Sequence, residues 1–171
     1  DNNCTELVNE TEPRLLNYYM MEPEGKYKAD ICRVCALYQT GGYYFDVDMG
    51  TVQAWDADKS NCTFRTGRCS KQELGFSNSF ITATPQHAVL QEALSVMLRH
   101  YRGGRNFNGT VHDLMGPKTL FQAYKQINYA QVEPYAECIG EEILLTATRY
   151  PNVTRSDGNG CCCNHVVHSA S

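Results

Sequence analysis

A Gly-Gly pair, a short aromatic run and two spaced aspartates constrain the fold of this chain more than any other segment. Helical spacing of apolar residues predicts a helix over about 27–40, Gly41-Gly42 ends it, and residues 43–47 have the composition of a strand. Asp46 and Asp48 follow, and the two-residue period of a strand puts both side chains on one face. Two carboxylates that face one way repel each other unless a cation lies between them. Oxygen ligands suit Mg²⁺ or Mn²⁺, which complete their shell with substrate phosphates, so the pattern predicts a metal site that grips a diphosphate.

The remainder of the chain alternates between helical and strand patterns. Further helices are expected to begin at Thr11-Pro13, Thr84-Pro85 and Gly116-Pro117. Further strands are expected over 51–55, 76–82 and 143–148, with a long polar surface loop over 56–73. Because strands alternate with helices and no internal repeat or linker interrupts them, we expect one α/β sandwich domain over 1–171.

The bulk composition bounds the kind of protein. The 171 residues are 42% hydrophobic and 20% charged, which suffices for one core. The net charge is -4 and no basic run tracks along the chain, so we expect no nucleic-acid partner. No apolar run approaches the roughly 18 residues of a membrane span. The chain opens with neither Met nor a signal peptide, so we expect a piece of a longer protein.

Cysteine and asparagine patterns indicate the compartment. The chain has nine cysteines in 171 residues. Asn-x-Thr acceptors for N-glycosylation begin at Asn3, Asn9, Asn61, Asn108 and Asn152. One or two such tripeptides arise by chance, but this many beside so many cysteines favours a lumenal or extracellular location.

The predicted helix before the Gly-Gly pair carries two charged residues that bear on function. Asp30 and Arg33 are three positions apart and share a helix face. An exposed surface ion pair is one interpretation. The helix leads directly into the strand carrying Asp46, however, so Arg33 could reach anionic oxygens while Asp30 accepts hydrogen bonds from hydroxyls. A metal, an arginine and a free carboxylate around one pocket would suit a sugar joined to a diphosphate.

These motifs resemble those of a known family. Lys-x-Asp-x-x-Arg at 28–33 and Gly-Gly-x-Tyr-x-Asp-x-Asp at 41–48 resemble the DXD region of family 32-like glycosyltransferases. That family includes the yeast initiation α-1,6-mannosyltransferases and the α-1,4-galactosyl- and N-acetylglucosaminyltransferases; the glucosylating clostridial toxins are more distant. Residues 78–87 are similar to its strand and Pro-x-His segment, and Gly116-Pro117 resembles its Thr-Gly-Pro helix start with Met115 in place of Thr.

The resemblance implies a GT-A-like, Rossmann-like α/β/α fold and a role for several residues. Asp48 would bind Mn²⁺ or Mg²⁺ directly, and Asp46 would contact the nucleotide ribose and the water shell of the metal. Asp30 would bind hydroxyls of the donor sugar, and Arg33 would contact sugar or phosphate. Asn78 would belong to the same donor-binding set.

The C-terminal segment completes the resemblance. Residues 165–171 look like the start of the family's closing His-rich Ser-Trp segment, which stops here before the Trp. His168 and Ser171 would then be late metal ligands, with a terminal exposed histidine as the alternative for His168. Because little sequence precedes the first motif, we expect the chain to lack the family's first, base-binding strand.

The family also implies an activity, partners and a location. The expected reaction is retaining hexose transfer from a nucleotide-diphosphate sugar, of the GDP-mannose, UDP-galactose or UDP-N-acetylglucosamine type, to a glycan or glycolipid. The expected location is the Golgi lumen, with membrane attachment only through an N-terminal anchor outside this chain.

The cysteines have other interpretations. Cys32 and Cys35 form a Cys-x-x-Cys on the predicted helix, where two buried thiols are favoured over a zinc site. Cys62 and Cys69 could close a loop as a disulfide. The run 161–163 with His165 could hold zinc, although adjacent cysteines lack the usual two-residue gap.

Two other functions are compatible with parts of the sequence. A haloacid-dehalogenase phosphatase begins with a strand ending in Asp-x-Asp-Gly-Thr, and residues 46–51 come close with Met49 inserted. That insertion shifts Gly50 and Thr51 out of register, and the preceding helix has no role there. A non-catalytic, sugar-binding relative of a transferase is the other alternative, which the intact aspartate pair opposes.

Overall fold

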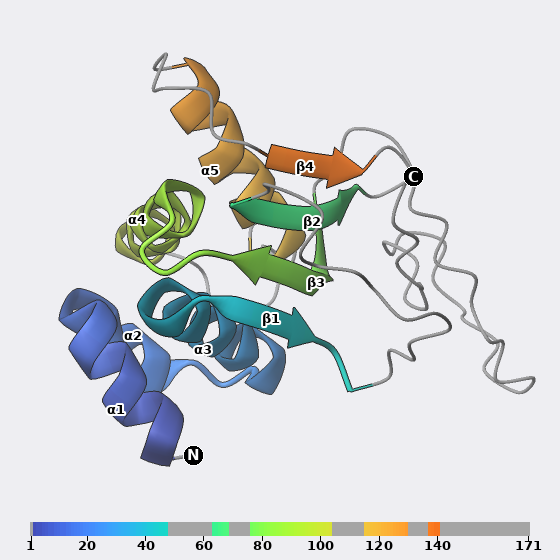
Figure 1. Ribbon diagram of the computed structural model, residues 1–171. Coiled ribbons are helices and arrows are strands. Elements are labelled where there is room, and N and C mark those ends of the chain that lie inside the picture. Colours follow the sequence, from blue (N-terminus) through green and yellow to red (C-terminus); the bar gives the residue numbers. More distant parts are fainter. Residues whose placement is uncertain (1, 48–62, 69–75, 104–114, 130–136, 141–171) are drawn as a thin grey trace, which may run out of the picture.

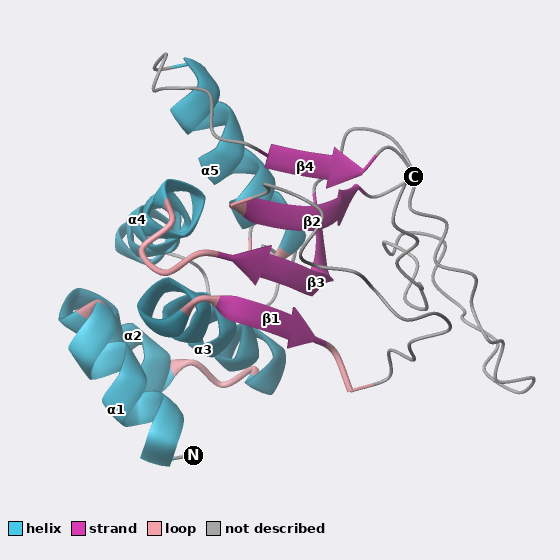
Figure 2. Ribbon diagram, viewed as in Figure 1, coloured by secondary structure: helices cyan, strands magenta, loops and turns pink. Residues whose placement is uncertain are grey.

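The structure is a computed structural model, and it describes residues 2–47, 63–68, 76–103, 115–129 and 137–140. Helices and strands within these ranges form an α/β arrangement (Figures 1 and 2). In chain order they are α1 (Asn2–Thr11), α2 (Pro13–Met21), α3 (Gly25–Thr40), β1 (Gly42–Phe45), β2 (Phe64–Arg68), β3 (Phe76–Ala83), α4 (Ala88–Arg102), α5 (Pro117–Tyr129) and β4 (Glu137–Gly140).

The described strands form one mixed sheet in the order β1-β3-β2-β4. Strand β3 pairs antiparallel with β1 on one side and with β2 on the other, while β2 and β4 are parallel. In the first pairing Phe45 lies opposite Phe80, and their rings are 5.0 Å apart between centroids. The α/β class expected from the alternating patterns is therefore confirmed.

The described helices pack against one face of this sheet. Helices α3 and α5 both contact β3, and α4 packs between them (Figure 1). Helices α1 and α2 form an outer layer over α3 and α4. The buried core includes Leu15, Ile31, Ile81, Leu90, Met97 and Leu120. None of the described helices has the length and apolar character that a bilayer crossing demands.

A disulfide between Cys4 and Cys32 ties α1 to α3, with 5.6 Å between the two Cα atoms. The expectation of a buried thiol at Cys32 was therefore wrong. Helix α1 has no strong start signal in the sequence, so local patterns did not indicate that Cys4 would lie beside Cys32. Cys35 is a buried thiol as expected, and burial raises its pKa to about 12. The other cysteines considered above lie outside the described residues.

The expected surface loop over 56–73 is also corrected, because residues 64–68 form strand β2. Its sequence, Phe-Arg-Thr-Gly-Arg, has little apolar character, but Phe64 and Thr66 are fully buried between neighbouring elements. Pairing with β3 and β4 on both sides stabilises a strand that local composition does not indicate. The strands expected over 51–55 and 143–148 lie outside the described residues.

Candidate donor-binding site

The turn between α3 and β1 sets the direction of the strand that carries the first aspartate. Gly41 has a φ of +64°, and a Cβ there would lie 2.6 Å from Pro85 Cδ. Only glycine fits this conformation and this close approach. The amide of Gln86 donates to the carbonyl of Tyr38 at 2.7 Å, which fixes the same loop to the end of α3. The segment before α4 therefore holds the start of β1 in place.

His87 in that segment has a structural role. Its side chain caps α4, because Nδ1 accepts a hydrogen bond from the Val89 amide at 3.2 Å. Its Nε2 lies 3.3 Å from Thr63 Oγ1, and its ring stacks on Phe64. Burial lowers the pKa of His87, so the neutral ring that accepts from the helix amide is favoured.

Arg33 joins three elements at the far end of β1. Its Nη1 donates to Asp46 Oδ1 at 3.1 Å and to the carbonyl of Asn78 at 2.7 Å. Its Nη2 lies 3.4 Å from Asp30 Oδ1, and the Arg33 side chain is only 9% exposed. The interpretation of Asp30 and Arg33 as an exposed ion pair is therefore wrong, because both side chains are enclosed between α3, β1 and β3.

Asp30 is the most deeply enclosed acid of this cluster. Its Oδ1 accepts from Asn78 Nδ2 at 2.7 Å and faces Arg33. Burial raises the pKa of Asp30 from 3.8 to about 6, although Arg33 and Asn78 both oppose the change. Arg33 and Asn78 thus favour the charged carboxylate against the effect of burial.

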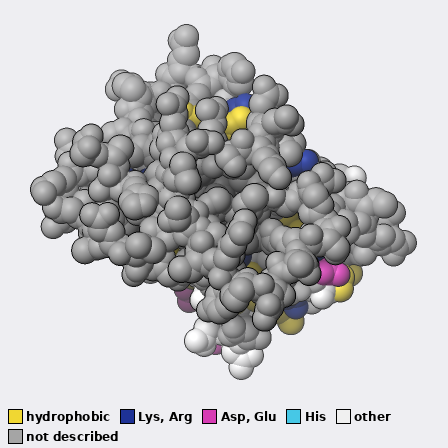
Figure 3. Space-filling view, turned by 90° about the vertical axis from the view of Figure 1, so that its right-hand side faces the viewer, with side chains coloured by type: hydrophobic (Ala, Val, Ile, Leu, Met, Phe, Trp, Pro, Cys, Tyr) yellow, Lys and Arg dark blue, Asp and Glu magenta, His cyan; other side chains and the backbone are white. Residues whose placement is uncertain are grey.

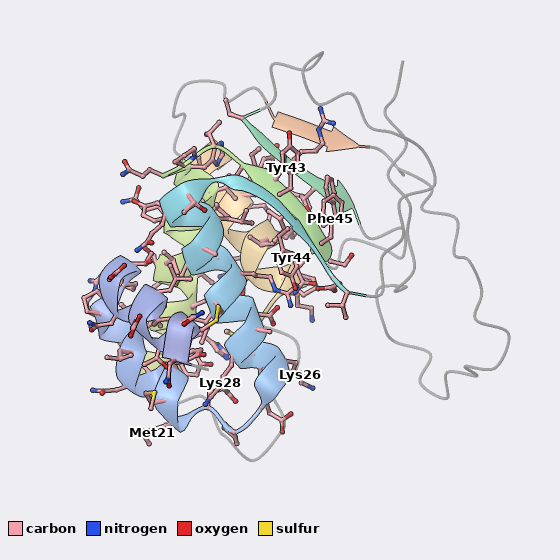
Figure 4. The ribbon with its side chains drawn as sticks, turned by 60° about the horizontal axis from the view of Figure 1, so that its bottom comes forward. Met21, Lys26, Lys28, Tyr43, Tyr44 and Phe45 are labelled. Atoms are coloured by element: carbon pink, nitrogen blue, oxygen red, sulfur yellow. A yellow bond between two sulfur atoms is a disulfide. The ribbon has the colours of Figure 1, made fainter. Side chains whose placement is uncertain are left out.

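Tyr44 is part of the cluster, and the sequence reasoning missed it. Its hydroxyl donates to Asp46 Oδ1 at 2.6 Å, and the Arg33 guanidinium lies 4.4 Å from the centroid of its ring. Burial raises the pKa of the Tyr44 phenol, so it stays a donor. Tyr44 projects from one side of the strand, while Tyr43 and Phe45 project from the other (Figure 4). The two-residue strand period was a signal that could have found it.

Gly116 is a second residue that the sequence reasoning did not place in the site. It precedes α5 with a φ of +70°, and a Cβ there would lie 2.5 Å from Asn78 Nδ2 and 3.0 Å from Asp30 Oδ2. The turn into α5 therefore closes over the amide and carboxylate of the cluster. A Gly-Pro pair marks the turn in the sequence, but its neighbours come from α3 and β3 and are not visible there.

The donor set fits a hard divalent cation in part. Both described side-chain contacts of Asp46 are to Oδ1, and the side chain is 33% exposed, so its second oxygen can face a hydrated ion. Within the ranges that the structure describes, no three His, Cys, Asp or Glu residues come together as a metal site. The other expected ligands, Asp48, His168 and Ser171, lie outside these ranges.

Figure 3 shows the face at the right-hand side of Figure 1, toward which β1 runs. Acidic, basic and hydrophobic side chains of described residues reach the surface close together near one edge of this view.

Of the expected site residues, the structure brings together Asp30, Arg33, Asp46 and Asn78. One guanidinium serves two carboxylates, so the cluster combines a net negative charge with donors for phosphate or hydroxyl oxygens.

Comparison with known proteins finds sequences similar to this chain. Residues 1–64 match the family model described as the glycosyltransferase sugar-binding region containing DXD motif. Inositol phosphoceramide mannosyltransferase 1 of Schizosaccharomyces pombe is 29% identical over 129 residues, which cover 75% of this chain and 39% of the relative.

A solved structure is also similar. The PaToxG glycosyltransferase superimposes with a TM-score of 0.57 at 25% sequence identity, over 70% of this chain and 42% of that chain. This likeness supports the GT-A-like α/β fold expected above. The chain therefore spans less than half the length of the curated relative and of the solved structure.

Proposed function

We propose that the chain binds a nucleotide-diphosphate sugar for metal-dependent hexose transfer, a proposal that the match of residues 1–64 to the glycosyltransferase sugar-binding region supports. The observation that carries the proposal is the position of Arg33, whose guanidinium contacts Asp30, Asp46 and Asn78 at once. Such an enclosed, charged cluster at the end of a strand is costly to build for stability alone, and it is typical of binding sites.

Each described residue has a role in this proposal. The Asp30 carboxylate accepts hydrogen bonds from hydroxyls of the donor sugar, and Asn78 holds that carboxylate in place. Arg33 offsets the charge of sugar-linked phosphate oxygens or donates to the sugar. Asp46, which is oriented by Arg33 and Tyr44, contacts the ribose and the water shell of the metal.

The remaining ligands belong to the proposal as well. Asp48 binds Mn²⁺ or Mg²⁺ directly, with His168 and Ser171 as late ligands. When bound, the cation neutralises and orients the leaving diphosphate. The carboxylates near the anomeric carbon favour the positive charge that develops there, and the acceptor hydroxyl attacks on the face that the diphosphate leaves. The configuration of the sugar is then retained.

The comparisons support only a general choice of substrates. One relative is named as a mannosyltransferase that acts on inositol phosphoceramide, which makes GDP-mannose a good first donor to test and a glycolipid or glycan the acceptor class. We propose a secretory-pathway location, in the Golgi lumen. The acceptor tripeptides and the Cys4–Cys32 disulfide favour an oxidising compartment.

The test is nucleotide release from GDP-mannose, UDP-galactose and UDP-N-acetylglucosamine, with and without Mn²⁺. We expect release by the native chain with Mn²⁺, and a loss of about 100-fold or more in Asp46→Asn and Asp48→Asn. Glu92→Gln is the matched control, because it removes a carboxylate from an ion pair on α4 outside the cluster and should leave the rate unchanged.

Three results would contradict the proposal in different ways. Equal release by the native chain and both aspartate variants would exclude a donor site at this strand. Metal-dependent binding of nucleotide sugar without turnover would instead favour the non-catalytic, sugar-binding relative. Release of phosphate from simple phosphomonoesters, with no release from nucleotide sugars, would favour the phosphatase alternative.

A further inference from the structure

Helix α1 has one face that packs on the molecule and one that is open to solvent. Val8 is fully buried, and Cys4 and Leu7 pack against the same core at helical spacing. Asn3 and Asn9 lie on the exposed face, each as the first residue of an Asn-x-Thr tripeptide. A large substituent on either amide would therefore project into solvent from the outer layer of the fold (Figure 1).

The two tripeptides differ in what holds them. The central residue of the first is Cys4, which is bonded to Cys32 of α3. Its third residue, Thr5, is half-buried and reaches Met20 of α2, with 3.9 Å between Oγ1 and Sδ. The second tripeptide has no cysteine, and Thr11 donates locally, from Oγ1 to the carbonyl of Leu7 at 2.7 Å.

Helical geometry determines whether an asparagine of α1 is modified before or after the helix forms. Residues two apart on a helix point away from each other, so an enzyme cannot grip the asparagine amide and the threonine hydroxyl together once α1 has formed. Modification must precede folding of the helix. The disulfide joins residues 28 positions apart and ties the first tripeptide covalently to α3. The second tripeptide has no covalent tie: Thr11 donates within its own helical turn, and Glu10 accepts from Gln39 Nε2 of α3 at 3.4 Å.

We propose that Asn9 carries an N-linked glycan and that formation of the Cys4–Cys32 disulfide keeps Asn3 unmodified. The inference rests on the lumenal location proposed above, but not on transferase activity. A host enzyme moves an oligosaccharide from a lipid-diphosphate donor: a bond forms between Asn9 Nδ2 and the anomeric carbon, the bond from that carbon to the diphosphate breaks, and the amide loses one proton. The two thiols give up two electrons and two protons to a disulfide-exchange oxidant of the same compartment.

The experiment expresses the full chain behind a cleavable secretion signal in a eukaryotic cell and measures occupancy of each asparagine by peptide mass spectrometry after glycosidase treatment. We expect most chains to be modified at Asn9 and few at Asn3. Thr11→Ala should abolish modification of Asn9, while Thr11→Ser should preserve it. Neither Cys4→Ala nor Cys32→Ser removes an acceptor tripeptide, and both should raise Asn3 occupancy several-fold with Asn9 unchanged.

The outcomes separate the two parts of the proposal. An unmodified Asn9 in chains that are modified at Asn61, Asn108 or Asn152 would overturn the first part. Equal occupancy of Asn3 in the native chain and in both cysteine variants would overturn the second. Because modification needs a tripeptide that is not yet in a formed helix, a variant that folds poorly still gives a readout, and none of these results depends on nucleotide-sugar turnover.

Discussion

Two buried carboxylates in this fold have opposite surroundings. Glu22, at the end of α2, is 2% exposed; its Oε2 accepts from the Tyr101 hydroxyl at 2.6 Å and its Oε1 from the Glu24 amide at 3.0 Å. Asp30, on α3, is 6% exposed and lies beside the guanidinium of Arg33. These two contacts of Glu22 are with uncharged donors among helices, whereas Asp30 belongs to an ionic cluster at the sheet.

Under the proposed function, this difference separates an acid that serves packing from one that serves donor binding. The contacts of Glu22 connect α2 to α4 and to the residue before α3, so both oxygens serve the packing of helices. Asp30 shares its arginine with Asp46, and its Oδ2 faces Gly116 at the start of α5. Because the Asp30 carboxylate shares Arg33 with a second acid, a bound ligand can take one of these contacts or add a further partner to the carboxylate.

Replacing Arg33 should have the largest effect on this contrast. In Arg33→Met the two carboxylates of the cluster lose their shared cation, so we expect a loss of about 3–5 kcal/mol in the free energy of unfolding. Nucleotide release should fall below detection. Urea unfolding and the release assay measure the two effects.

Arg99→Met is the matched control for this change. Arg99 pairs with Glu92 at 2.7 Å, but its side chain is 55% exposed, so its loss should cost no more than about 1 kcal/mol. If both variants lose the same stability, the cluster is no more than a surface ion pair and the contrast between the two acids fails.

Gly116→Ala should have the next largest effect. The new Cβ would lie 2.5 Å from Asn78 Nδ2, at a backbone conformation that side chains rarely adopt. We expect a cost of about 2–4 kcal/mol and loss of nucleotide release. Gly25→Ala is the control, because nothing lies within 4 Å of its Cβ position at the start of α3, and it should leave stability unchanged or slightly raised. Equal behaviour of the two variants in thermal unfolding would argue against close packing at Gly116.

Local patterns predicted the elements that have strong periodicity and clear ends. The helix ending at Gly41 and the strand after it follow from spacing and from glycine, and these also place Asp30, Arg33 and Asp46 near one another. Strand β2 could not be predicted in this way, because Phe64 and Thr66 are buried by strands from distant parts of the chain. Its polar composition alone resembles that of a loop.

The cluster shows the same limit of local information. The contact between Asp30 and Asn78 spans 48 residues, and Gly116 reaches both from a third element. Tyr44 was predictable from strand period alone, since it lies two residues before Asp46, but only the structure shows that its hydroxyl and Arg33 meet on one oxygen. The disulfide partner of Cys32 was not predictable, because α1 has no strong start signal.

The next prediction concerns how the free energy of unfolding depends on pH through the Asp30 carboxyl. Because burial raises its pKa to about 6, the folded chain binds this proton more tightly than the unfolded chain does. The stability it contributes is fully present below its ordinary pKa of 3.8 and is lost as the pH rises through about 6, by up to about 3 kcal/mol. Asp30→Asn should lack this decline, which the difference between the two unfolding curves from pH 4 to 7 isolates. Parallel curves would show that Asp30 titrates normally.

The smallest expected effects come from two tyrosines that each donate to one carboxylate. Tyr101→Phe removes the hydroxyl that donates to buried Glu22, so we expect a loss of about 1–2 kcal/mol in the free energy of unfolding with no change in KM for the nucleotide sugar. Tyr44→Phe keeps the ring beside Arg33 but removes the hydroxyl from Asp46.

Because the Asp46 side chain is 33% exposed, water can replace the Tyr44 hydroxyl, and the stability of Tyr44→Phe should change by less than about 1 kcal/mol. Its KM should nevertheless rise, since Asp46 is then oriented by Arg33 alone. The two variants should thus change different quantities: Tyr101→Phe lowers stability, and Tyr44→Phe weakens donor binding. If Tyr44→Phe lowers stability as much as Tyr101→Phe while leaving KM unchanged, Tyr44 serves packing in the way that Tyr101 does. Its hydrogen bond to Asp46 would then be no evidence that this acid takes part in donor binding.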